Sequence, residues 1–152
     1  MTYEQLLQDY GAKIGIQDME VDKEGAVFEL DDFPVVVRPD EPSQRVALMA
    51  EIGDIVPERQ GDVAAKLLKL SFATALNGGM TMAASEDAGK YYCMASLPLA
   101  GLDAERFELE LAAIASKGRA ARDLLQAEAQ LEQARQSREQ TQAMSSDSTI
   151  RI

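Results

Sequence analysis

The stretch LLKLSFATALNGGMTMAASEDAGKYYCMASLPLAGLDAERFELEL, residues 67–111, decides the fold because it contains a helix end, a hairpin and a helix start in that order. Its first part is rich in leucine and alanine, and Asn-Gly-Gly at 77–79 is a helix C-terminal signal. Upstream, Gly61 and Asp62 open the same helix, with Asp62 as the expected N-cap. A helix that is apolar nearly all round must be buried on more than one side, so we expect a second chain to cover part of it.

A hairpin and a third helix follow this stop. Residues 80–85 and 90–97 are expected to be β-strands around the turn sequence Glu-Asp-Ala-Gly at 86–89. Pro98 ends the second of these strands, and Asp103 is the expected N-cap of the third helix. Apolar or small residues then alternate in steps of four and three, which predicts a seam along a sheet or another helix. These residues are Phe107, Leu111, Ile114, Gly118, Ala121 and Leu125.

The residues before this stretch predict one helix and three strands. Thr2 and Gln5 form a capping-box pattern, and apolar residues at helical spacing predict a helix over roughly 3–14. The predicted strands, joined by tight turns, cover residues 26–30, 33–38 and 45–52. In the last of them Val46, Leu48, Ala50 and Ile52 share one face. The expected fold class is α+β: a twisted antiparallel sheet packed with helices, in the order α-β-β-β-α-β-β-α, in a homodimeric protein.

The chain is expected to divide into an α+β domain, residues 1–125, and a polar extension, residues 126–152. The extension is rich in glutamine and keeps one large apolar residue, Leu131, before Met144. We expect a solvated helix there and a disordered tail over residues 145–152. Large apolar residues are too sparse in this segment for a sustained heptad seam, which disfavours a coiled-coil adaptor.

The composition excludes several classes of function. The chain has 152 residues, a net charge of −11 and no apolar stretch of the kind found in signal peptides or bilayer-spanning helices. Its negative field repels phosphate backbones and anionic membranes, so we expect neither nucleic-acid binding nor membrane insertion. The expected location is cytoplasmic.

The sequence offers no convincing catalytic or metal-binding set. It lacks histidine, and its one cysteine, Cys93, lies in a predicted strand where a small buried apolar residue is expected. The clustered carboxylates are most simply turn formers, a helix cap and solvated charge, and no calcium-loop or phosphate-loop motif occurs. These carboxylates are Glu51, Asp54, Glu58, Asp62 and the pair Asp31-Asp32. We therefore expect no enzyme activity, no cofactor and no metal ion.

Apolar surface is the remaining feature that suggests function. The edge strands, the first helix and several methionines provide more apolar surface than one small core needs. Methionine is adaptable and recurs at surfaces that accept varied partners. For each of these residues taken singly, burial in the core is an equally good interpretation.

Four local patterns, in this order and spacing, resemble the Tir-chaperone family of type III secretion effector chaperones (class I). They are Leu67-Leu68, Gly78-Gly79, Leu97-Pro98-Leu99, and Leu102-Asp103 followed by Phe107. The resemblance covers residues 1–125 and is strongest over 67–111. Members of that family often have a large aromatic residue late in the third helix, where this chain has Ala120, Ala121 and Arg122.

The resemblance implies a cytosolic bacterial homodimer that binds the N-terminal segment of one or more effectors and keeps it extended, soluble and export-competent. Strand pairing at a sheet edge and insertion of apolar side chains into grooves are the implied modes of binding. On this basis the predicted dimer-interface residues are Leu67, Leu68, Phe72 and Leu76. The predicted effector-binding residues are Leu6, Leu7, Tyr10, Val35, Val37, Met80, Met82 and Met94. The secretion ATPase is a further candidate partner.

A second hypothesis is a cytosolic regulatory or general-folding domain of the same fold with no role in secretion. Copurification with a single partner that has a disordered N-terminus would favour the chaperone hypothesis over this one.

Overall fold

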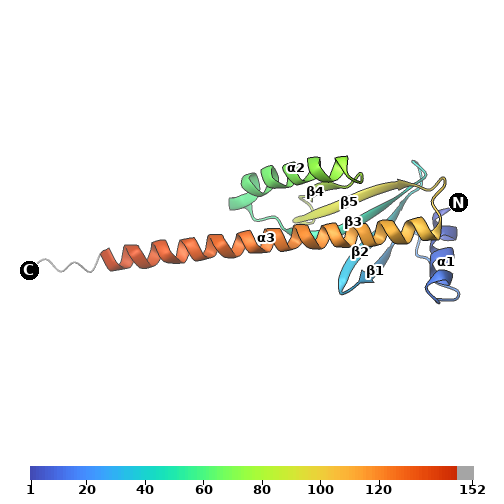
Figure 1. Ribbon diagram of the computed structural model, residues 1–152, viewed down its shortest axis with the longest axis horizontal. Coiled ribbons are helices and arrows are strands. Elements are labelled where there is room, and N and C mark those ends of the chain that lie inside the picture. Colours follow the sequence, from blue (N-terminus) through green and yellow to red (C-terminus); the bar gives the residue numbers. More distant parts are fainter. Residues whose placement is uncertain (147–152) are drawn as a thin grey trace, which may run out of the picture.

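The computed structural model of the chain describes residues 1–146 as three helices, five strands and a short 3-10 turn (Figure 1). The elements are α1 (Tyr3–Lys13), β1 (Ala26–Leu30), β2 (Phe33–Asp40), β3 (Arg45–Asp54), η1 (Pro57–Arg59), α2 (Gln60–Leu76), β4 (Thr81–Ser85), β5 (Lys90–Pro98) and α3 (Ala104–Ser146). The strands form one antiparallel sheet in the order β1-β2-β3-β5-β4. The α+β class and the predicted order of elements are confirmed.

The helices cover one face of the sheet. α3 runs across β2, β3 and β5, α1 packs against α3 at one end, and α2 lies over β4 at the opposite edge (Figure 1). The alternation predicted for β3 is confirmed, because Val46, Leu48, Ala50 and Ile52 are all buried on the helix side. The core therefore lies between one sheet face and the three helices, and the β1 and β4 edges bound it.

Of the two aspartates predicted as helix N-caps, the structure confirms one and contradicts the other. Asp103 is the N-cap of α3, because its Oδ1 accepts a hydrogen bond from the backbone N–H of Arg106 at 2.8 Å. Asp62 is not the cap of α2: that helix begins at Gln60, directly after η1, and its N-cap residue Arg59 makes no side-chain capping bond. Pro57 starts this helical turn earlier than the Gly61-Asp62 signal suggested, so Asp62 lies inside the first turn, where its charge is favourable.

α3 approaches the sheet closely at Gly118. A Cβ atom placed on Gly118 would lie 2.9 Å from the Cβ of Ala50 and 3.1 Å from the ring of Phe33. The same ring lies beneath two guanidinium groups, with the Cζ of Arg119 at 5.5 Å and that of Arg122 at 4.3 Å from its centroid. Arginine thus covers Phe33 in the region of α3 where the resembling family often has an aromatic residue.

We expect Gly118→Ala to destabilise the protein, whereas Gly61→Ala should leave it unchanged or stabilise it. The new methyl group at 118 meets Ala50 and Phe33, and such overpacking costs about 1–3 kcal/mol. At Gly61, in the first turn of α2, nothing lies within 4 Å of the added Cβ, so the gain in helix propensity is at most about 0.5–1 kcal/mol. Urea unfolding at one protein concentration measures both changes. Equal effects of the two substitutions would contradict the close packing of α3 on the sheet.

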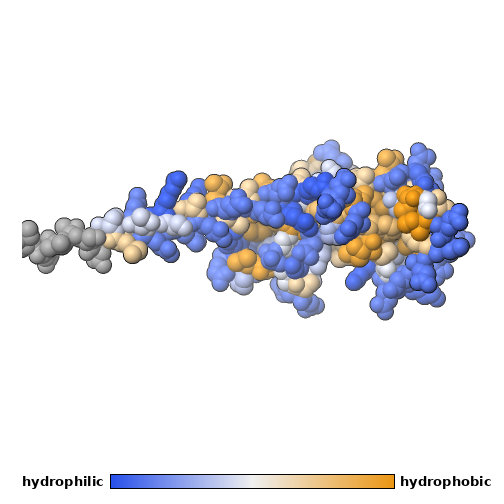
Figure 2. Space-filling model, turned by 90° about the horizontal axis from the view of Figure 1, so that it is seen from below, coloured by the Kyte–Doolittle hydropathy of each residue, from blue (hydrophilic) through white to orange (hydrophobic). Residues whose placement is uncertain are grey.

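α3 continues as a single helix far beyond the sheet, to Ser146 (Figure 1). Figure 2 shows this projecting part as a mainly hydrophilic rod attached to a body with hydrophobic patches. Ser145 and Ser146 are helical, although they fall within the tail expected to be disordered. The rest of that expected tail, residues 147–152, lies outside the described residues.

Candidate interaction surfaces

The outer face of α2 carries a stripe of large apolar side chains that nothing in residues 1–146 covers. Leu68, Phe72 and Leu76 are 69%, 71% and 71% exposed, and their spacing of four residues places them on one side of the helix. Burying one such side chain contributes about 1.5–3 kcal/mol relative to leaving it in water. We call these three residues the α2 stripe. A stripe of this size in so small a domain indicates an interaction site.

The structure separates Leu67 from its predicted partners. Leu67 is buried in the core, next to Val63 on the inner side of α2. Successive residues of a helix are about 100° apart, so Leu67 and Leu68 point to different faces. The prediction of Leu67 as a dimer-interface residue is therefore wrong, while Leu68, Phe72 and Leu76 are brought together at the surface.

Most of the predicted effector-binding residues also belong to the core. The side chains of these residues face the helices or, in α1, the sheet, and are at least about nine-tenths buried; they are Leu6, Leu7, Tyr10, Val35, Val37 and Met80. Tyr10 packs edge-on against Phe28 and Phe107, with ring centroids 5.4 and 5.2 Å away. The interpretation of these six as contact residues is wrong, because the covered face of the sheet needs them.

The two remaining methionines are half-buried and lie on opposite faces of the sheet. Met82 faces the helices and lines a groove between α2 and α3 with Leu70 and Leu124. Met94 lies on the other face, among neighbours that sequence reasoning did not select. One row of directly paired residues crosses all five strands on that face: Val27, Val36, Met49, Met94 and Thr81.

We call this second side the open face, because its apolar residues do not belong to the core cluster. Val36, Met49 and Met94 are half-buried only by their neighbours in the sheet, and Val27 at the end of the row is 63% exposed. Tyr92 and Ala83, a directly paired couple on β5 and β4, add to the same face. The open face therefore presents an apolar row, flanked by charged and polar residues, that ends at the β1 edge.

The β1 edge is an unpaired strand edge whose backbone groups can be assigned. Asp31 and Asp32, which connect β1 to β2, have φ values of 50° and 62°, as a two-residue type I′ hairpin turn requires. In such a hairpin the residues flanking the turn, Leu30 and Phe33, exchange both backbone hydrogen bonds.

Hydrogen-bonded pairs then alternate along β1. Val27 and Glu29 belong to the pairs that are not hydrogen-bonded, so their backbone N–H and C=O groups point away from β2, toward the free edge of the sheet. The register agrees, because Glu29 lies opposite Pro34, which has no N–H to donate. β1 thus offers a short ladder of unpaired backbone groups beside the apolar row of the open face.

The clustered carboxylates do not build a reactive pair. Lys90 Nζ contacts both Glu51 Oε1, at 2.8 Å, and Asp54 Oδ1, at 2.6 Å, and these hydrogen bonds raise the pKa of Lys90. A hollow of about 480 Å³ lies nearby between the end of β3, the start of α2 and α3, and includes Arg59 and Arg122. Within residues 1–146 no three Cys, Asp or Glu side chains are grouped to hold a metal ion.

Cys93 is fully buried in β5, and its burial raises the pKa of the thiol to about 11. Since the thiolate is the reactive form, we expect a thiol reagent at about pH 8 to modify the native protein only as fast as it opens. Unfolding in urea should make the same thiol react at once. The release of the coloured product from a disulfide reagent measures both rates. Rapid stoichiometric labelling of the native protein would contradict the burial of Cys93.

Comparisons with known proteins agree with this architecture. Residues 5–122 match the model of the Tir chaperone protein (CesT) family. A chain of the HopA1–SchA chaperone–effector complex is 22% identical, with a TM-score of 0.64 over 80% of this chain and 93% of that chain. A chain of the ExsC–ExsE complex is 22% identical, with a TM-score of 0.66 over 82% and 97% of the two chains. A comparison with curated proteins gave no match.

A further similar structure is the heterodimeric ExoU–SpcU complex from the type III secretion system of Pseudomonas aeruginosa. One chain of that complex is 15% identical to this chain, with a TM-score of 0.61 over 78% of this chain and 96% of that chain. The family match thus defines the class of protein as a chaperone, and its fold is shared by chains of a chaperone–effector complex and of a complex from a type III secretion system. The chain belongs to the Tir chaperone protein (CesT) family, which confirms the resemblance seen in the sequence.

The family match ends at residue 122, so most of the projecting part of α3 lies beyond it. No helix within the described part of the chain is both long and apolar enough to span a membrane.

Proposed function

We propose that this chain is a cytoplasmic bacterial chaperone that dimerises through the α2 stripe. It binds the N-terminal segment of one or more secreted effectors without catalysing a reaction. One observation carries the proposal: the β1 edge and the open face together offer unpaired backbone groups beside uncovered apolar side chains. An extended segment satisfies both at once, by adding a strand and inserting alternate side chains.

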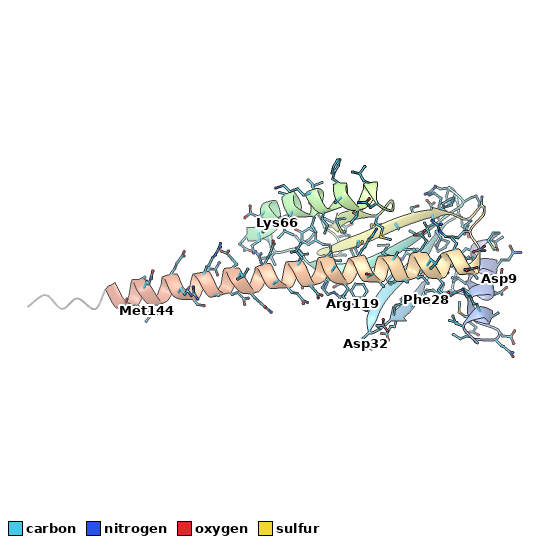
Figure 3. The ribbon with its side chains drawn as sticks, viewed as in Figure 1. Asp9, Phe28, Asp32, Lys66, Arg119 and Met144 are labelled. Carbon is cyan, nitrogen blue, oxygen red and sulfur yellow. The ribbon has the colours of Figure 1, made fainter. Side chains whose placement is uncertain are left out.

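The α2 stripe supports the homodimer. Leu68, Phe72 and Leu76 make a self-complementary contact when two α2 helices meet around a two-fold axis, because each copy presents the same surface. Lys66 does not interfere, since it turns toward α3 and pairs with Glu128 at 2.9 Å (Figure 3). A dimer of this kind places two client-binding edges in one particle.

The similar structures support a protein client. The HopA1–SchA structure is a chaperone–effector complex, and ExoU–SpcU is a heterodimeric complex from a type III secretion system. In our proposal the client of this chain is likewise an effector, held in an extended form that remains competent for export. We propose as effector-contact residues those of the open face instead of the buried residues predicted from the sequence. They are Val27, Val36, Met49 and Met94.

In this proposal residues 1–125 are the chaperone domain and residues 126–152 an extension. The support is that α3 still packs on the sheet at Leu125, whose Cδ1 lies 3.3 Å from a Cβ built on Gly53, whereas every side chain from Gln133 to Ser145 is exposed.

The test is affinity purification of the chain from its native bacterium, followed by identification of copurifying proteins. We expect one or a few secreted proteins that are lost when their N-terminal segment is deleted. Copurification of folded cytosolic proteins regardless of their N-termini would instead favour a general-folding domain, and recovery of no partner would contradict the chaperone function.

A further inference from the structure

The chain on both sides of β1 is rich in carboxylates. Seven exposed acidic side chains lie within the short stretch from the end of α1 to the start of β2: Asp18, Glu20, Asp22, Glu24, Glu29, Asp31 and Asp32. The same stretch holds one basic residue, Lys23. Glu29 stands on β1 itself, Glu24 precedes the strand, and the two aspartates of the turn follow it.

These carboxylates are not neutralised inside the protein. None of the seven takes part in an ion pair among residues 1–146, whereas Glu51, Glu108 and Glu128 all do. The guanidinium of Arg119, on α3, donates instead to the backbone oxygens of Leu30 and Asp31, at 2.9 and 3.0 Å. The edge therefore presents a negative field beside unpaired backbone groups.

A strand added to β1 would meet this field at defined positions. On the open face, the residue of the added strand that pairs with Val27 would extend the apolar row. The residue that pairs with Glu29, two positions along, would lie beside a carboxylate. On the other face, the residue opposite Phe28 lies beside the aromatic cluster of Tyr10 and Phe107. Chain continuing past the turn runs by Asp31 and Asp32.

We infer that the β1 edge selects an extended segment of basic and apolar character. It places lysine or arginine opposite Glu29 and beside the Asp31-Asp32 turn, and apolar residues opposite Val27 and Phe28. This inference rests on the proposed function and adds the chemistry of the client. Unpaired carboxylates on an edge strand repel other acidic edges and would lose water against uncharged ones, so the same residues disfavour edge-to-edge aggregation of the free chaperone.

The test uses two fluorescein-labelled peptides and the full chain. Both peptides alternate valine and threonine, and one carries lysine at the positions that face Glu29 and the turn, where the other carries glutamate. Fluorescence anisotropy gives Kd for the wild-type protein and two quadruple variants. The first is Glu24→Gln, Glu29→Gln, Asp31→Asn and Asp32→Asn, in which asparagine tolerates the positive φ of the turn.

The matched control also removes four negative charges, at exposed positions away from β1. It combines Glu58→Gln, Glu86→Gln, Asp87→Asn and Glu139→Gln. We expect the wild type and the control to bind the lysine peptide at least about tenfold more tightly than the glutamate peptide. The edge variant should lose most of this preference, and raising the salt from about 50 to about 300 mM should weaken it in the wild type.

Equal affinity of the wild type for the two peptides, or equal losses in both variants, would overturn the inference. So would failure of both peptides to bind. The proposed function is judged separately by the copurified client: a chaperone that captures a secreted protein but binds both peptides alike retains its function and loses only the charge selection.

Discussion

Replacing Leu68 and Phe72 by glutamate is expected to convert the protein from a dimer into a monomer. In the dimer that we propose, each α2 stripe is buried against its copy, and the double variant would place four uncompensated carboxylates in that contact. Removing charged groups from water without partners costs several kcal/mol per ion, and the same substitutions remove the apolar contribution of two of the three stripe residues in each copy. Light scattering on a sizing column should show the mass fall from twice 16.5 kDa to 16.5 kDa.

The matched control for this variant is Leu109→Glu with Leu131→Glu. Both leucines are exposed on α3, at 61% and 64%, and neither belongs to the α2 stripe. This variant changes the charge equally and should remain dimeric. A dimeric Leu68→Glu, Phe72→Glu protein would show that the two copies meet elsewhere.

Val27→Pro is expected to abolish client capture while leaving the fold and the dimer intact. Proline removes the outward N–H of Val27, and its ring obstructs an added strand. Proline is tolerated on edge strands when the lost N–H faces solvent, so the β1–β2 pairing should survive. We expect affinity for the N-terminal segment of the copurified client to fall at least about tenfold.

Val27→Thr is the control, because threonine keeps the backbone donor and the β-branched shape. Circular dichroism and the mass of the dimer show that both variants fold. Unchanged client affinity in the proline variant, with wild-type behaviour of the threonine variant, would exclude strand addition at β1.

The local signals of the sequence predicted the architecture well. The capping box of Thr2 and Gln5 starts α1, and glycines with positive φ end α2 at Gly78 and Gly79. These signals depend only on residues that are neighbours in the chain, so they can be recognised in the sequence without knowing the tertiary packing. The start of α2 was predicted too late in the sequence, at Asp62, because Pro57 begins a helical turn that leads into α2 at Gln60.

The interaction surfaces were harder to predict, because they depend on which face of each element the helices cover. Three consecutive valines at 35–37 fix a strand but not its orientation, and a shift of one residue exchanges the two faces. The structure buries Val35 and Val37 and leaves Val36 on the open face. Alternation in β3 predicts that Met49 lies on the other face of the strand from Leu48. Only the pairing of the strands shows that Met49, Met94 and Val27 lie in one row.

The most direct test of the account is the mass of the complex that the chain forms with its copurified client, measured by light scattering, before and after limited proteolysis. We predict two copies of this chain with one client, joined through a protease-protected N-terminal segment of the client. A monomer of this chain on its own, or a complex whose client remains bound after its N-terminal segment is removed, would contradict the account.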